Sequence, residues 1–216
     1  MIPGAELAAW LADNHVQARS QEGVDDSARR WSVHPLMTRL ERELTELSEP
    51  TPEAVLAAAR RFIDQSEDIE GLVRDLIASS RAERFFRPPF YPVSSEIHTG
   101  LLLFHSNILS LALGVSGVEL LAAKKSGKRG PTSIGLSGLV TLFRYVKAGN
   151  ATVSFWEAPP IGENFVAGEA GTARFVERRR LKDGDEILID GRHQSFIIEH
   201  ADSDMVYFQA LSLIHI

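Results

Sequence analysis

Apolar side chains recur every three or four positions along the first 84 residues, as they do on one face of an α-helix. Leu36, Leu40 and Leu44 form one such stripe, and Leu72 and Leu76 belong to another. After residue 97 the pattern changes to short apolar runs separated by polar residues and glycines, which is typical of β-strands. The sequence therefore predicts an α+β protein whose helices precede its strands.

The helical part contains signals for the ends of individual helices. Thr51, Pro52 and Glu53 form a helix start, because threonine caps an N-terminus, proline suits the first turn and an acidic side chain favours the positive end of the helix dipole. Ser66 is expected to cap the next helix. The polar segment at residues 21–27 contains a glycine and is interpreted as a loop. We therefore predict about four helices in this region.

An aromatic and proline-rich segment, FFRPPFYP at residues 85–92, separates the two parts. Its prolines exclude a helix, and its four rings favour packing over a loose linker. We predict an extended strap over residues 85–96 whose rings pack on the following domain. The rings belong to Phe85, Phe86, Phe90 and Tyr91. The expected division is a helical region at residues 1–84, the strap, and a β domain at residues 97–216.

Several segments of the β domain have the composition of strands. They cover residues 100–104, 108–113, 118–123, 139–146, 151–156 and 173–181, followed by three antiparallel strands within residues 184–213. Asp190-Gly191 and Asp202-Ser203-Asp204 mark tight turns between the last three strands, and Gly149 marks another turn. Many short strands with turns between them predict a sandwich or a barrel.

The overall composition narrows the class of protein. The 216-residue chain is 44% hydrophobic and 24% charged, as in an ordinary globular protein. It has no cysteine, which excludes disulfides, thiolate catalysis and cysteine-bound metals. Its net charge of −6 argues against a nucleic-acid or membrane-surface partner. No signal peptide or membrane span is recognised, and we expect a cytoplasmic protein.

Motifs with a fixed spacing give no catalytic signature. No segment matches a phosphate loop, a nucleophile elbow or a zinc-protease helix. The basic segment KKSGKRG at residues 124–130 is interpreted as a solvated hairpin loop. A second basic cluster, formed by Arg178, Arg179 and Arg180, lies on a predicted strand, where successive side chains point to opposite faces. The arginines therefore do not form one continuous patch.

Seven histidines remain as candidates for metal chemistry. Four of them lie in predicted strands or their turns: His98, His105, His193 and His200. None forms a His-x-His pair, which would place two ligands on one strand face. His193 and His200 are separated by an odd number of residues and are expected on opposite faces. We interpret the histidines as surface or core residues.

The order of strands and turns in the β domain resembles the cupin, or RmlC-like jelly-roll, superfamily over about residues 97–213. Cupins carry two motifs, G(x)5HxH(x)3-4E(x)6G and G(x)5PxG(x)2H(x)3N. Gly149 matches the last glycine of the first motif, and Gly184 matches the first glycine of the second. The positions that hold metal in cupins carry other residues in this chain. They fall on Gly135 or Leu136, on Ser137 or Gly138, on Leu142 and on Ser195.

The resemblance implies a cupin-like, antiparallel jelly-roll barrel without a catalytic metal or other cofactor. Its pocket is then expected to be lined by residues that share a face with the missing ligands. Arg144 has this facing on the first-motif strand, and His193, Ser195 and Glu199 have it on the second. We predict these four as ligand-binding residues. Arg144 is expected either to pair with Glu199 or to hold a small anion.

The leading hypothesis is a non-catalytic, metal-free, cupin-like protein that binds a small ligand, such as an anion, or a protein partner. A homodimer is compatible with this hypothesis. The alternative is a metal-dependent cupin enzyme of the dioxygenase or isomerase class, with ligands from His98, His105, His193 and His200. A third hypothesis is a structural protein whose helical region docks another chain. We expect neither nucleic acid nor a membrane as partner.

Overall fold

The computed structural model describes residues 4–82, 85–95, 97–126, 134–159 and 171–214. The chain divides into two compact units. The first contains Met1–Glu46 and Arg61–Tyr91, and the second contains Leu47–Arg60 and Pro92–Ile216. Residues 47–60 thus group with the strands, and the division predicted from the sequence stays a prediction. None of the helices within the described ranges is long and apolar enough to cross a bilayer.

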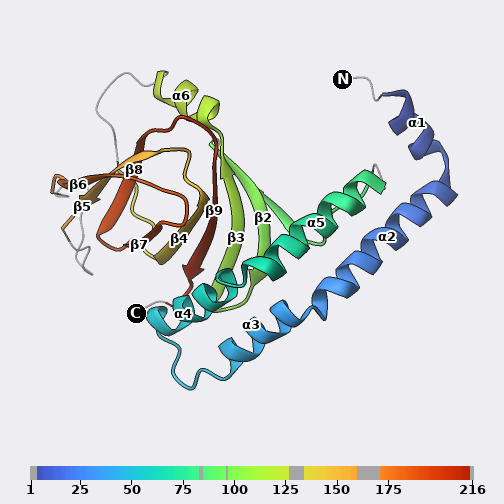
Figure 1. Ribbon diagram of the computed structural model, residues 1–216, viewed down its shortest axis with the longest axis horizontal. Coiled ribbons are helices and arrows are strands. Elements are labelled where there is room, and N and C mark those ends of the chain that lie inside the picture. The colour runs from blue at the N-terminus through green and yellow to red at the C-terminus, as the bar shows by residue number, and fades with distance from the viewer. Residues whose placement is uncertain (1–3, 83–84, 96, 127–133, 160–170, 215–216) are drawn as a thin grey trace. The chain divides into compact units, whose positions relative to one another are not determined.

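Among the described residues, five helices precede the first strand. They are α1 (Ala5–Ala12), α2 (Asn14–Ser32), α3 (Pro35–Thr45), α4 (Pro52–Ile63) and α5 (Ser66–Ala82) (Figure 1). The prediction of about four helices is wrong, because residues 21–27 continue α2 instead of forming a loop. Gln21 Nε2 donates to Asp25 Oδ1 at 2.8 Å across one helical turn. Such a polar i,i+4 contact stabilises the exposed side of the helix, whereas Ser20, Ser27 and Trp31 on α2 are buried.

Capping and apolar spacing explain the helices that were predicted. Thr51 Oγ1 accepts a hydrogen bond from the Ala54 N–H at 3.3 Å, which confirms the predicted cap of α4. The stripe formed by Leu36, Leu40 and Leu44 is buried, as its spacing in α3 predicts.

The aromatic strap packs differently from the prediction. The ring of Phe85 lies 4.9 Å from that of Trp10, and the ring of Phe90 lies 5.8 Å from that of Trp31, so both contact residues of α1 and α2. Tyr91 is 79% exposed. The expectation that these rings pack on the following domain is therefore wrong for Tyr91, and Phe85 and Phe90 stabilise the helical unit.

Nine strands are described, and they form two antiparallel sheets. The strands are β1 (Tyr91–Ser94), β2 (His98–His105), β3 (Leu109–Ser116), β4 (Val140–Lys147), β5 (Thr152–Glu157), β6 (Arg174–Arg180), β7 (Glu186–Asp190), β8 (Gln194–His200) and β9 (Met205–Ser212). One sheet has the order β1-β2-β3-β9-β4-β7 and the other has the order β6-β5-β8. Figure 1 shows the smaller sheet facing the larger one. We call them the six-stranded and the three-stranded sheet.

Consecutive strands at the end of the chain lie in different sheets. Strand β7 pairs with β4, β8 pairs with β5, and β9 pairs with both β3 and β4. The three strands predicted within residues 184–213 are therefore present, but they do not pair with one another as a meander. A chain whose consecutive strands lie in two different sheets is typical of a jelly roll. The predicted barrel is not closed, because no ladder among the described strands joins the two sheets.

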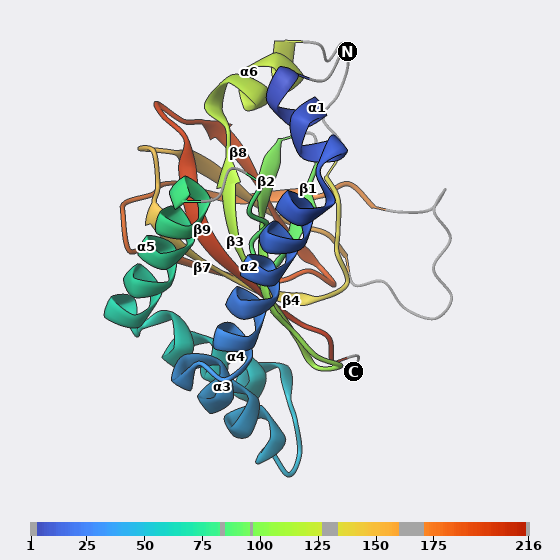
Figure 2. The ribbon, with the colours of Figure 1, turned by 90° about the vertical axis from the view of Figure 1, so that its right-hand side faces the viewer.

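One predicted strand is a helix. Residues 118–123 belong to α6 (Val118–Ser126), whose leucines, alanines and glutamate are strong helix formers. The Asp204 carboxylate accepts the Val118 N–H at 2.9 Å, which caps the first turn. Figures 1 and 2 both show α6 at one end of the strands, where β3 ends and β9 begins.

The turn between β4 and β5 carries the chain from one sheet to the other. Gly149 and Asn150 both have positive φ, at 58° and 51°, which is the geometry of a type I′ turn. A Cβ on Gly149 would lie 2.3 Å from the Ser203 carbonyl oxygen, so glycine is required for the close approach as well.

Candidate functional site

Ring contacts between the sheets identify the inner face of each strand. Phe143 on β4 lies 5.2 Å from Phe196 on β8, edge to face. Both pack on the apolar core that also includes Tyr145. Because side chains alternate along a strand, Arg144 and Glu199 point outward from this core. The predicted inward facing of Arg144 and Glu199 is therefore wrong, because each lies one residue out of step with the inner face of its strand.

Arg144 and Glu199 have different partners on the two outer faces. Arg144 Nη1 lies 3.4 Å from Glu186 Oε1 and donates to the Gly184 carbonyl at 3.1 Å. Glu186 also accepts from Arg60 Nε at 3.1 Å. Glu199 accepts from Ser154 Oγ at 2.7 Å on the three-stranded sheet. The predicted pairing of Arg144 with Glu199 is wrong, since the two strands belong to opposite sheets.

The other two predicted ligand-binding residues lie near one end of β8. His193 Nδ1 is 3.8 Å from Asp190 Oδ2, and Ser195 Oγ donates to the Gly135 carbonyl at 2.8 Å. Of the four predicted residues, only Ser195 lines the described cavity. A ligand-binding role for the four stays a prediction.

The histidines of the alternative hypothesis do not converge. His98 Nδ1 lies 2.9 Å from Ser95 Oγ, and His200 Nε2 lies 2.9 Å from Asp202 Oδ1. Within the ranges that the structure describes, no three histidine, aspartate or glutamate side chains are grouped as metal ligands. The described residues thus do not fit the cupin metal centre that the alternative requires.

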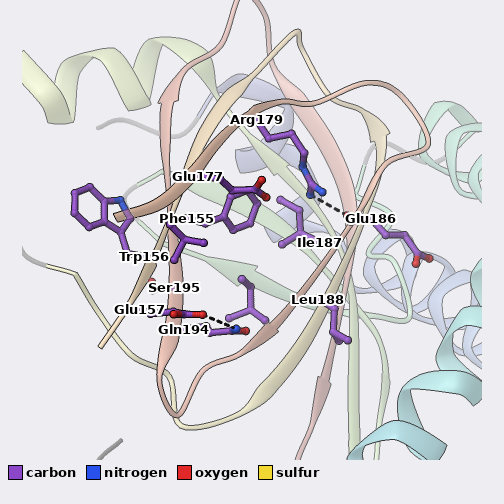
Figure 3. A pocket seen from close by; sticks show the side chains of 12 residues that line it. Phe155, Trp156, Glu157, Glu177, Arg179, Glu186, Ile187, Leu188, Gln194 and Ser195 are labelled. Carbon is purple, nitrogen blue, oxygen red and sulfur yellow. Dashed lines mark hydrogen bonds between the residues drawn. The ribbon is translucent and has the colours of Figure 1, made fainter. Parts of the chain in front are cut away.

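A cavity of about 220 Å³ opens between strands of the two sheets. Its lining consists of Phe155, Trp156, Glu157, Val176, Glu177, Arg179, Glu186, Ile187, Leu188, Ile189, Gln194 and Ser195, from β5, β6, β7 and β8 (Figure 3). Phe155 and Ile187 form part of an apolar wall, and the charged side chains of Glu157, Glu177 and Arg179 project from the strands around it. The combination of an apolar wall with a few polar groups is typical of a small-molecule site.

Arg179 is the positively charged residue among those that line the described cavity. It pairs in register with Val153, a core residue, and its side chain consequently points inward, whereas Arg178 and Arg180 point outward. Arg179 Nη2 donates to the Glu186 carbonyl at 3.1 Å, and the guanidinium carbon lies 5.1 Å from the centre of the Phe155 ring. Among the described residues, Arg179 Nε is buried and has no hydrogen-bond partner.

The charges around Arg179 are not neutralised by a neighbour. Within the described part of the chain neither Arg179 nor Glu177 forms an ion pair. By contrast, Glu157 pairs with Arg174 and accepts from Gln194 Nε2 at 3.4 Å. A buried N–H without a hydrogen-bond partner lowers the stability of the folded protein, and buried polar groups are almost always hydrogen bonded for this reason.

Two tyrosines behind the cavity remain neutral. Burial raises the pKa of Tyr145, the nearby Tyr207 raises it further, and the positive charge of Arg179 opposes the rise. Burial also raises the pKa of Tyr207, although its hydrogen bond with Ser116 opposes this. These two tyrosines thus contribute no anion to Arg179 at neutral pH.

The sequence alone carries a partial signal for the facing of Arg179. Three successive arginines on a strand must divide between its faces, so Arg179 had to face opposite to Arg178 and Arg180. Which of the two groups faces inward depends on the pairing of β6 with β5, and the pairing is a tertiary property.

The chain is similar to several solved structures of low sequence identity. No protein-family model matches the chain, and no curated protein matches it. An RmlC-like cupin family protein with a double-stranded β-helix fold from Methanocaldococcus jannaschii is 11% identical, with a TM-score of 0.31 over 58% of this chain and 87% of that one. KdgF from Halomonas sp. is 13% identical, with a TM-score of 0.34 over 57% and 86%.

A third similar structure is the capsular polysaccharide assembling protein CapF from Staphylococcus aureus. It is 11% identical, with a TM-score of 0.36, and the match covers 60% of this chain but only 32% of CapF. With TM-scores below 0.5, these similarities say nothing of activity or ligand.

Proposed function

We propose that the β domain is a non-catalytic, metal-free binding module that holds a small anionic molecule in the cavity, with Arg179 as its anchor. The observation that carries this proposal is the position of Arg179, whose guanidinium lines the cavity and forms no ion pair with any described residue. A carboxylate or phosphate would supply that charge through charge-assisted hydrogen bonds.

The donor geometry supports an anion. A guanidinium has five N–H donors in a planar fork, and among the described residues one hydrogen bond, to the Glu186 carbonyl, is made at Nη2. The Phe155 ring covers part of the group and restrains its orientation. An arginine fixed in this way loses little side-chain entropy when it binds a planar anion.

The size of the cavity supports a small ligand. Its volume of about 220 Å³ lies below the roughly 300–1,000 Å³ of pockets for drug-sized molecules. Ile187 and Ile189 are buried in the wall and offer apolar contact to a short carbon chain. Ser195, predicted as a ligand-binding residue, stays in the proposal as part of the polar lining.

A thermal-shift screen with small carboxylates and phosphates tests the proposal. We expect at least one compound to raise the melting temperature of the wild-type protein, because a ligand at about 100 times its Kd stabilises the folded state by about 2.7 kcal/mol. Arg179→Met should abolish this shift. Arg178→Met is the matched control, since Arg178 is on the outer face of the same strand, and it should retain the shift.

Two results would contradict the proposal. One is a screen in which no small anion shifts the melting temperature. The other is a compound that shifts the wild-type protein and Arg179→Met equally, since such a compound binds elsewhere.

A further inference from the structure

We infer that the ligand is a zwitterion of the amino-acid type, whose carboxylate is bound by Arg179 and whose ammonium group is bound by Glu177. This inference rests on the proposed function and adds the class of the ligand. It starts from the observation that two residues of opposite charge line the same cavity from the same strand.

The strand places the two charges side by side. Glu177 pairs in register with Phe155, and Arg179 pairs with Val153, both of which pack in or against the core. Glu177 and Arg179 therefore share the inner face of β6, about 7 Å apart along the strand. In an α-amino acid the carboxylate and the ammonium group are joined through one carbon, so one molecule can reach both side chains.

Glu177 and Arg179 are both available for a ligand. In the described part of the chain they form no ion pair with each other or with any other residue. The third charged side chain, Glu157, is already held by Arg174 and Gln194. A ligand with both charges would thus satisfy the two groups that have no charged partner.

The same arrangement selects against molecules whose charges all have the same sign. A dicarboxylate would place its second anion near Glu177 or Glu157, and a plain amine would place its cation near Arg179, so each would meet a like charge. The apolar wall of Phe155, Ile187 and Ile189 would contact the carbon side chain of the ligand. Glu177 is exposed and Arg179 is half-buried, so the ammonium group would lie nearer the solvent.

Matched pairs of compounds test the inference. The probes are the common L-amino acids with uncharged side chains, each beside the carboxylate that lacks only its amino group; L-valine and 3-methylbutanoate form one such pair. We expect at least one amino acid to bind the wild-type protein at least tenfold more tightly than its partner, as measured by titration calorimetry. Glu177→Gln should remove this tenfold preference, and Arg179→Met should abolish binding of both compounds.

The outcomes separate this inference from the proposed function. If the carboxylate without an amino group binds as tightly as the amino acid, or if Glu177→Gln leaves the preference unchanged, the zwitterion is wrong and the anion site stands. If neither member of any pair binds, and the anion screen is also negative, both proposals fail.

Discussion

The two sheets of the β domain differ in what their strands expose. Every residue of β3 and β9 is buried or half-buried, which means that both faces of these central strands of the six-stranded sheet are covered. In β6, at the edge of the three-stranded sheet, six of seven residues are exposed and Arg179 alone is half-buried. The central strands of the first sheet therefore stabilise the domain by apolar burial, and β6 is the strand whose charged groups bind the ligand in the proposed function.

The arginines of β6 repeat this contrast within one strand. Arg178 and Arg180 lie 3.8 Å and 3.7 Å from the carboxylates of Glu199 and Asp202 on the outer face, where such exposed pairs contribute little to stability. Arg179, between them, points toward the cavity and forms no ion pair among the described residues. Neighbouring residues of one type thus have different surroundings because the strand turns them to different faces.

The largest expected loss of stability comes from a substitution in the centre of the six-stranded sheet. Leu142 on β4 and Leu188 on β7 face each other directly in the ladder, but Leu142 is fully buried and Leu188 is 52% exposed. Leu142→Ala should lower the free energy of unfolding by about 2–5 kcal/mol, and Leu188→Ala should cost much less. Urea unfolding measures both. Equal losses would show that the edge strand is as tightly packed as the centre.

The turn that connects the two sheets should be the next most sensitive to substitution. Gly149 and Gly184 both have positive φ, but a Cβ would collide with the Ser203 carbonyl only at Gly149 and would meet nothing at Gly184. Gly184→Ala should lower the free energy of unfolding by about 1–2 kcal/mol, the cost of a left-handed residue. Gly149→Ala should lower it by more. The reverse order in urea unfolding would contradict this account of the turn.

Asp183 makes a smaller contribution to stability, and this contribution depends on pH. Asp183 accepts hydrogen bonds from the Ala148 N–H and from Lys147 Nζ, both at 2.9 Å, and these contacts hold the pKa of its carboxyl below the usual range. Because the folded-state pKa lies below the unfolded one, the contribution is present above about pH 4 and is lost as the pH falls through the folded-state pKa.

Asp183→Asn tests this contribution. The variant should be less stable than the wild-type protein at pH 7, and the difference should shrink when both are unfolded in urea at decreasing pH below about 4. A difference that is independent of pH would show that the charge of Asp183 does not contribute.

The positions of most strands could be predicted from the sequence, but their facing could not. Turn residues such as Gly149 and Gly191 bound the strands and are local signals. The strand β4 has the sequence VTLFRYVK, in which Leu142 and Tyr145, on opposite faces, are both buried. A strand that is covered on both sides has no clear alternation, so nothing local distinguishes its two faces.

The candidate site could be predicted only in part, for the same reason. Ser195 was predicted and lines the cavity. The prediction of Arg144 rests on the cupin resemblance, which gives β4 the wrong facing, and the ladder that turns Arg179 inward joins residues 152–157 to residues 174–180. The helix at Val118 was missed because an apolar run of this length suits a helix and a buried strand equally well.

The most direct test of the contrast between the sheets is the unfolding of Arg179→Met in urea without any ligand. If Arg179 serves a ligand, the methionine removes a buried N–H that has no partner among the described residues. The free energy of unfolding should then stay within about 0.5 kcal/mol of the wild-type value or increase. A loss of more than about 2 kcal/mol would show that Arg179 is a structural residue and would contradict the central claim.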